Sequence, residues 1–246
     1  MTVYNAAAYV AASVAAALQQ SHRNYELIVL DDGSTDGTAE ILQGIRDPRL
    51  CYIREARVGR AQALNHAIEA AAGQYLAIND ADDLSLPGRL TDICQAFEAR
   101  TDLGLLATNA ILTKQFLPRL PDEFANDTSR KPKKIRTISS ATLYRNNPFV
   151  HSTVAFRKTL WSQLKGYDTS LSLCIDYDFY LRASAVSTIG WLPLKTVLYY
   201  RNPDSFFKKV SLQEYILTLR RIREGVRKSL RLPFWAGFYD IVRHRQ

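Results

Sequence analysis

Three carboxylates within four residues follow an apolar run in the first half of the chain. The run is Tyr75–Ile78, and the carboxylates are Asp80, Asp82 and Asp83. Consecutive apolar residues predict a short buried strand, and carboxylates crowded at its end repel and raise one another's pKa. A hard divalent cation would relieve the repulsion, because it binds carboxylate oxygens and shares them with phosphates. An acidic turn before the helix that starts near Pro87 explains the same residues equally well.

A second acidic segment follows another predicted strand. Residues 25–30 have the composition of a strand, and they lead directly into Asp31-Asp32-Gly-Ser-Thr-Asp-Gly-Thr. Glycines and short polar residues in this arrangement are typical of a turn that caps a helix. That structural explanation accounts for Ser34 and Asp36, but it leaves two adjacent acids at the end of the strand unexplained.

Charged residues also stand at the starts of two predicted helices. Arg57 and Arg60 lie where one helix begins, and Asp176 and Asp178 open another. A basic residue on a helix is commonly a solvated charge, and acids near a helix N-terminus interact favourably with its dipole. Each segment has a structural explanation when taken alone. It is their succession along one chain that indicates a single site.

The elements that must position these segments alternate between strand and helix. This alternation predicts an α/β fold whose mainly parallel sheet is flanked by helices with right-handed crossovers. In such sheets ligands bind outside the carboxyl ends of the strands, which is where the acidic segments lie. The predicted elements of the first half are helices at 6–20 (with Asn5 as N-cap), 38–45, 59–72 (closed by Gly73) and 87–99, and strands at 25–30, 50–53, 75–78 and 103–108.

The second half is organised differently. Lys114–Arg136 contains three prolines and no periodicity, which predicts a long surface loop of the kind that often binds ligands. A strand at 151–157, a helix at 176–184 and a strand at 194–200 are expected to follow. Residues 211–230 form an amphipathic helical pattern with a basic face, and aromatic residues follow it. We therefore expect a C-terminal helical extension.

Composition limits the classes of function. The chain has 246 residues, of which 47% are hydrophobic, and a net charge of +8. From Lys208 onward there are ten Lys and Arg against three Asp and Glu, so the body is nearly neutral. That distribution argues against a nucleic-acid-binding protein, the rival class. Three widely spaced cysteines indicate reduced thiols in the cytoplasm, and the uncharged Met1–His22 segment is an amphipathic helix rather than a signal peptide.

Taken together, these segments resemble the family-2 inverting glycosyltransferases, which have the GT-A fold. The resemblance rests on VYN, YELIVLDDGSTDGT, GRAQALNHAIEAAAGQYLAINDADD, HSTVAFRK, GYD and CIDYDFYLR, and it covers roughly residues 1–201. It implies transfer of a sugar from a nucleotide-diphosphate sugar, a UDP-sugar, to a hydroxyl of a glycan or lipid-linked acceptor in surface polysaccharide biosynthesis. A relative that binds nucleotide-sugars without catalysis is the alternative.

The resemblance also assigns roles to single residues. Thr2 and Tyr4 match the region near the nucleotide base, and Asp31 and Asp32 match acids that contact uracil or ribose. Arg60 matches a basic residue close to the nucleotide.

The remaining matches concern the metal and the catalytic base. Asp80 and Asp82 match the DxD pair that holds Mg²⁺ or Mn²⁺, with Asp82 the stronger ligand, while Asp83 is expected to serve only the turn. Asp176 matches the catalytic base, although the Glu that usually precedes it is Ile175 here. His151 precedes a strand, and a structural role is favoured for it over a catalytic one.

The resemblance further implies a division of the chain. Residues 1–207 form the catalytic domain, with a nucleotide-sugar half at 1–110 and an acceptor half at 111–207. Residues 208–246 form a basic amphipathic tail that is expected to contact the inner face of the cell membrane peripherally. The alternative is a helix that packs its apolar stripe on the domain and leaves its basic face in solvent. Only Met1–Tyr4 remain for a strand before the first helix, so we expect the natural first strand to be longer.

Overall fold

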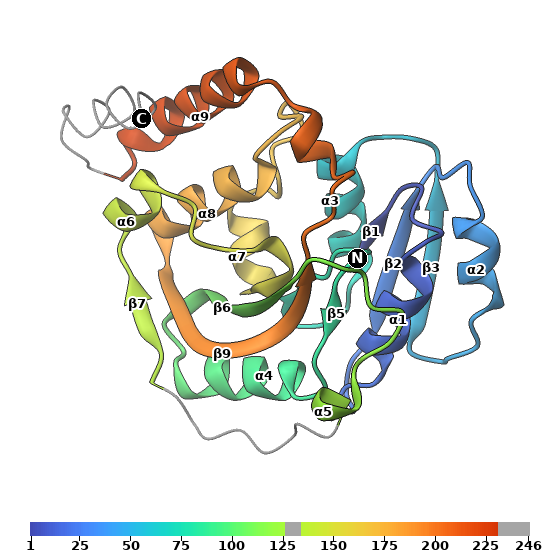
Figure 1. The fold of residues 1–246 in the computed structure, drawn as a ribbon. Helices are drawn as coiled ribbons and strands as arrows, with labels where there is room; N and C mark the ends of the chain where they lie inside the picture. Colours follow the sequence, from blue (N-terminus) through green and yellow to red (C-terminus); the bar gives the residue numbers. More distant parts are fainter. Residues whose placement is uncertain (126–133, 231–246) are drawn as a thin grey trace.

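The computed structural model describes residues 1–125 and 134–230. Its first sheet is parallel, with the order β1 (Thr2–Val3), β2 (Leu27–Asp32) and β3 (Leu50–Glu55). Successive side chains of β2 point to opposite faces, so Val29 packs with α1 (Val10–Leu18) and α2 (Thr38–Gly44), while Ile28 and Leu30 face α3 (Arg60–Ala70). Helices therefore cover both faces of this sheet (Figure 1).

A second, mixed sheet forms the rest of the body. Its order is β4 (Tyr75–Ala77), β8 (Val154–Arg157), β6 (Leu103–Thr113), β9 (Thr188–Tyr200) and β5 (Leu84–Ser85), with β7 (Arg136–Ile138) also paired to β9. The central pair, β6 and β9, is parallel, and the other pairs are antiparallel. The predicted α/β architecture, in which helices flank the sheets, is confirmed.

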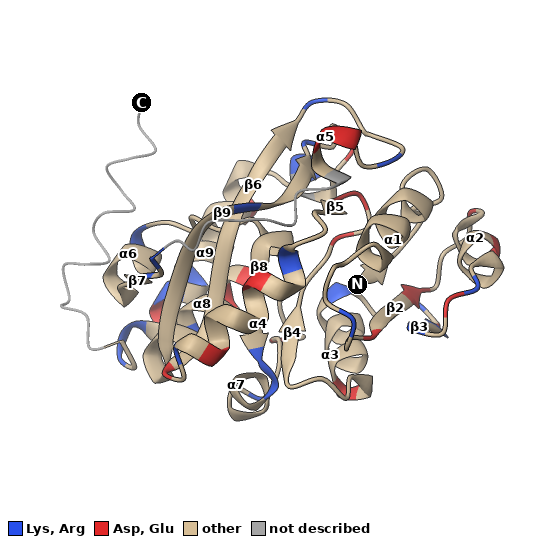
Figure 2. Cartoon of the chain, turned by 90° about the horizontal axis from the view of Figure 1, so that it is seen from below, with Lys and Arg blue, Asp and Glu red and all other residues tan. Residues whose placement is uncertain are grey.

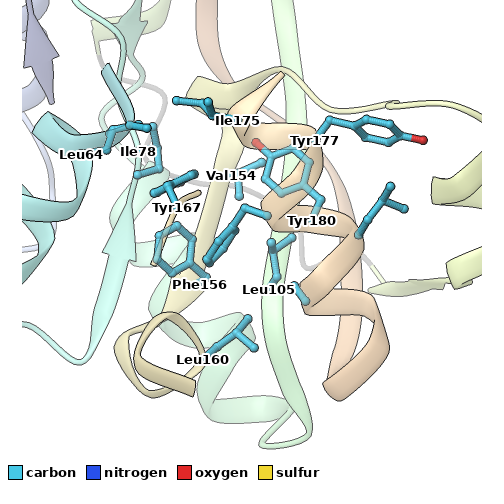
Figure 3. Packing of buried hydrophobic residues seen from close by; sticks show 14 of the residues in the cluster. Leu64, Ile78, Leu105, Val154, Phe156, Leu160, Tyr167, Ile175, Tyr177 and Tyr180 are labelled. Atoms are coloured by element: carbon cyan, nitrogen blue, oxygen red, sulfur yellow. The ribbon is translucent and has the colours of Figure 1, made fainter. Parts of the chain in front are cut away.

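The main core lies between the second sheet and helices α3 and α8 (Ile175–Val186). Figure 3 shows Ile175 and Tyr180 of α8 in one cluster with Phe156 of β8 and Leu64 of α3. Helix α4 (Arg89–Ala99) packs on the other face of the sheet through Ile93 and Phe97. Because α8 is fixed in this core, the residues at its N-terminus have a defined position.

The remaining short elements line the second half. They are α5 (Asp122–Ala125), α6 (Ser140–Arg145), η1 (His151–Thr153), α7 (Lys158–Gln163) and η2 (Phe206–Lys209). The C-terminal helix α9 (Leu212–Arg227) begins at Ser211, whose hydroxyl accepts a hydrogen bond from the backbone N–H of Glu214. Leu219, Ile222 and Val226 of α9 are buried in the main core. The rest of the predicted tail, residues 231–246, lies outside the described residues.

Several predicted boundaries need correction. Helix α1 begins at Val10 rather than Ala6, and Asn5 is not its N-cap. Asn5 has a φ of 49° and its side-chain oxygen accepts from the backbone N–H of Thr35 at 2.8 Å, so it joins the first turn to the second acidic segment. The capping residue of α3 is Ala71 rather than Gly73. The predicted loop at 114–136 contains α5 and the first residue of β7, and its residues 126–133 lie outside the description.

Helix α1 contacts both sheets. Val10 and Val14 pack with Val29 of the first sheet, whereas Ala12 and Ala16 pack with Leu84 and its neighbours in the second. Within residues 1–125 and 134–230, none of the helices combines the length and the apolarity that crossing a bilayer requires.

Candidate active site

The carboxyl ends of β2 and β4 carry the acidic segments that the sequence singled out. Asp31 and Asp32 end β2, seen as its red tip in Figure 2, and Asp80–Asp83 follow β4. The start of α3 supplies Arg60, and the start of α8 supplies Asp176. Elements from both sheets thus contribute to one region.

Arg60 links the acidic segment after β4 to His151 in η1. Its Nη2 donates to Asp80 Oδ1 at 2.6 Å and to His151 Nδ1 at 3.0 Å. Because a guanidinium cannot accept, His151 Nδ1 is the acceptor, and the ring's Nε2–H then faces the hydroxyl of Tyr167 at 3.3 Å. His151 is buried and is part of the site, where it orients Arg60.

The charges around Arg60 show which acids are neighbours. Asp80 is the largest influence that raises the pKa of Arg60, and Asp176 and Asp82 raise it further. Burial alone would raise the pKa of Asp80, but the positive charge of Arg60 holds it well below its usual range. Asp80 therefore contacts the guanidinium of Arg60 directly, and the charges of Asp82 and Asp176 also act on it.

The other two carboxylates of the acidic segment behave in the opposite way. Burial, followed by the charge of Asp80, raises the pKa of Asp82 and raises that of Asp83 to about 8. The predicted mutual repulsion is therefore seen in Asp82 and Asp83, but Asp80 escapes it through Arg60.

Asp83 has a structural position. It is fully buried and accepts hydrogen bonds from the backbone N–H of Tyr200 at 3.0 Å and from the hydroxyl of Ser152. Asp82 is partly exposed, and its Oδ2 accepts from Asn202 Nδ2 at 3.1 Å. Asp83 ties the loop to β9, while Asp82 keeps access to solvent.

A divalent cation fits Asp82 and its neighbour Asp80 by the chemistry of their oxygens. In the described part of the chain, no cluster of three or more His, Cys, Asp or Glu side chains is arranged to hold a metal ion. Mg²⁺ is usually held by one or two carboxylates, with water and the phosphate oxygens of a bound molecule as its other ligands.

Asp31 and Asp32 are both engaged by the protein. Asp31 accepts from the backbone N–H of Ser34 at 2.9 Å and from the hydroxyl of Tyr52 at 3.1 Å. Asp32 Oδ1 accepts from the backbone N–H of Val58 at 2.7 Å. The two acids that the sequence left without a structural explanation thus shape the turn after β2 and the loop before α3.

Tyr4 and Arg57 form a stacked pair beside Asp32. The guanidinium carbon of Arg57 lies 3.2 Å from the centre of the Tyr4 ring, and Arg57 Nη1 lies 3.7 Å from Asp32 Oδ2. Tyr4 is 44% exposed, so an aromatic surface is available at the end of the first sheet. Thr2 lies in β1, paired with Leu30.

Asp176 is the second residue of α8 and is partly exposed. Its Oδ2 accepts from Asn147 Nδ2 at 3.3 Å. Ile175, which replaces the expected Glu, is buried in the main core, so that substitution adds packing to the start of α8. Cys174, just before the helix, has a left-handed φ of 56°.

Sequence reasoning missed three contributors to this region. Asn202 and Asn147 contact Asp82 and Asp176 from 120 and 29 residues away, and Tyr167 contacts His151. The only sequence signal was that Tyr167 stands in a motif already noted, Gly-Tyr-Asp.

Comparison with known proteins gives a consistent result. Residues 1–162 match the family Glycosyl transferase family 2. A curated relative, the putative glycosyltransferase EpsE of Bacillus subtilis, is 28% identical over 95% of this chain and 82% of its own length.

Solved structures share the fold. S. aureus TarS in complex with UDP superposes with a TM-score of 0.73 at 17% identity, over 96% of this chain and 66% of that one. The mannosyltransferase PcManGT of Pyrobaculum calidifontis, solved with GDP-Man and Mn²⁺, gives 0.67 at 18% identity, over 98% and 71%. This chain therefore spans about two thirds of the TarS 1–349 chain and 38% of the longer TarS chain.

Proposed function

This chain belongs to glycosyl transferase family 2, and on that premise we propose that it is an inverting, metal-dependent hexosyltransferase that uses a UDP-sugar. The observation that carries the proposal is the 2.6 Å bond from Arg60 to Asp80, together with the charges of Asp82 and Asp176 that act on the same guanidinium. Sugar transfer from a diphosphate needs acids that bind a metal ion, a positive side chain near the phosphates and a general base. Asp80 and Asp82, Arg60 and Asp176 are the candidates for these three roles.

The leaving diphosphate develops negative charge as the sugar–phosphate bond breaks. Mg²⁺ or Mn²⁺ held by Asp82 and Asp80 would stabilise that charge as a Lewis acid. Arg60 adds a fixed positive charge beside the same acids, held in place by its bonds to Asp80 and His151. A preorganised charge of this kind favours the transition state without reorganising during the reaction.

The acceptor hydroxyl must lose its proton as it attacks the anomeric carbon. We assign this proton to a carboxylate oxygen of Asp176, whose Oδ2 is oriented by Asn147. A single attack from the face opposite the diphosphate inverts the anomeric centre. General-base catalysis of this kind contributes about 10²–10⁴-fold to the rate.

In this proposal the nucleotide of the donor binds at the end of the first sheet. The exposed ring of Tyr4 offers a stacking surface for the base, with Thr2 beside it in β1. Asp31 and Asp32 sit at the end of β2, where a base or ribose can exchange with a present hydrogen-bond partner such as Tyr52. The UDP and UDP-GlcNAc complexes of TarS support a uridine donor.

We propose further that the acceptor is a glycan or a lipid-linked saccharide of surface polysaccharide biosynthesis, reached at the inner face of the cell membrane. The support is a surface just beyond Asn202. Phe206 and Leu212 are each 64% exposed, and the exposed Lys208 and Lys209 lie between them. Aromatic and basic residues together suit the interface of an anionic membrane.

Release of UDP from UDP-sugars in the presence of Mn²⁺ tests the function. The wild-type protein should release UDP with at least one UDP-sugar, and Asp176→Asn should lower the rate by at least 10²-fold while binding UDP as before. An equal rate in Asp176→Asn would reject the assigned base. Binding of UDP-sugars without turnover in the wild type would instead identify a nucleotide-sugar-binding relative.

A further inference from the structure

The acids of the cation site differ in how the protein holds them. Asp80 is held by Arg60, a positive charge, and Asp83 is held by two donors and buried. Among the described residues, Asp82 receives one side-chain hydrogen bond from another residue, the one from Asn202. The orientation of Asp82 therefore depends on Asn202.

Asn202 is itself fixed by a local turn. Its Oδ1 accepts from the backbone N–H of Asp204 at 2.9 Å, and its main-chain carbonyl accepts from the N–H of Ser205 at 3.4 Å. Such a turn uses only the oxygen of an Asn side chain, and Asp or Ser would serve it too. The amide group, which the turn does not use, donates to Asp82.

The chemistry of an amide suits a cation ligand. A neutral Nδ2–H holds one carboxylate oxygen and leaves the negative charge of the carboxylate uncompensated. An Arg in the same place would offset that charge, as Arg60 does for Asp80, and would weaken the attraction for a cation. Partners that orient ligating carboxylates typically contribute 10–100-fold to metal affinity.

We propose that Asn202 is the positioning residue of the cation site: it holds Asp82 Oδ2 and so leaves Oδ1 for the cation. The inference rests on the proposed metal-dependent function. This role also explains the segment after β9, because the turn at 202–205 holds the amide of Asn202 against Asp82 of the acidic segment.

Binding of Mn²⁺ in the presence of UDP, followed by the electron paramagnetic resonance signal of free Mn²⁺, tests the inference without turnover. Asn202→Ser keeps an oxygen for the turn but removes the amide donor, and it should raise the Kd for Mn²⁺ by about 10-fold. Asn24→Ser, the same change at an exposed asparagine outside the site, should leave the Kd unchanged. The thermal midpoint of Asn202→Ser in EDTA should stay within about 2 °C of wild type.

A second variant distinguishes a local effect on the cation site from a general folding defect. Asn202→Asp keeps the turn oxygen but sets a carboxylate against Asp82, so it should melt at a lower temperature in EDTA and gain more from Mn²⁺ than wild type does. Wild-type Mn²⁺ affinity in Asn202→Ser, or an equal Mn²⁺ gain in Asn202→Asp, overturns the inference. Failure of wild type to bind Mn²⁺ with UDP would overturn both the inference and the metal dependence.

Discussion

Gly33, in the turn after β2, should not tolerate a side chain. Its φ is +73°, a left-handed conformation, and a Cβ added there would lie 2.8 Å from the backbone nitrogen of Arg57. The obstacle is main chain, so no side-chain rotation can remove it. Gly37 in the same turn has a φ of −71°, and its nearest neighbour to an added Cβ is Ala7 at 3.9 Å.

These geometries give different magnitudes for the same substitution. A non-glycine residue in the left-handed region costs about 1–2 kcal/mol, and overpacking against fixed atoms costs about 1–3 kcal/mol. Gly33→Ala should therefore lower the free energy of unfolding by about 2–5 kcal/mol. At Gly37 a small loss of N-cap preference is offset by a gain of about 0.4–1 kcal/mol from the stiffer unfolded chain, so Gly37→Ala should be nearly neutral.

Urea unfolding of both variants measures this difference directly. Binding of UDP, measured by calorimetry, should also weaken in Gly33→Ala, because the displaced loop carries Arg57 and the N–H groups that Asp32 accepts from. Equal stabilities for the two variants would refute the reasoning. So would a destabilised Gly33→Ala that binds UDP with wild-type affinity, since the loop would then not serve the nucleotide.

Three further predictions address other parts of the molecule. The pKa of Asp83 is raised to about 8, so the folded protein keeps a proton that the unfolded chain loses near pH 4, and the free energy of unfolding should fall as pH rises towards 8. In EDTA, Asp83→Asn should reduce the fall in the free energy of unfolding between pH 6 and 8 by on the order of 2 kcal/mol. Urea unfolding that gives the same pH dependence for Asp83→Asn and wild type would contradict this prediction. Tyr4→Ala should weaken UDP binding by about 10-fold if the base stacks on the ring, whereas Tyr4→Phe should bind normally; calorimetry would exclude stacking if both bind alike. Lys208→Glu with Lys209→Glu should reduce flotation with anionic liposomes, at roughly 1 kcal/mol per lysine, and equal flotation would remove η2 from the membrane contact.

The sequence predicted the elements and the acids of the site because both depend on local patterns. Apolar runs followed by carboxylates placed the end of β4 within one residue but that of β2 two residues early, because Asp31 and Asp32 belong to β2. The predicted start of α8, Asp176, lies one residue after its observed start at Ile175. The grouping of these acids around Arg60 was expected only through the family resemblance, since no local pattern measures their separation.

Contacts between distant segments account for what the sequence could not predict. Asn5 looked like an N-cap, but its side chain bonds to Thr35 instead. The structural role of Asp31 depends on Tyr52, 21 residues away, and that of His151 depends on Arg60, 91 residues away. In each case the residue type was informative, but its partner was decided by tertiary packing.

Helix α1 acts as a spacer of fixed width. Its valines rest on the first sheet, while Ala12 and Ala16 meet the segment at Leu84, and the hydroxyl of Ser13 donates to the main-chain oxygens of Asp80 and Asp83. The small residues on this side let the acidic segment lie close to α1 and the first sheet. The width of α1 therefore sets the distance between the first sheet and the acidic segment, and a single larger side chain at Ala12 or Ala16 would lengthen that distance.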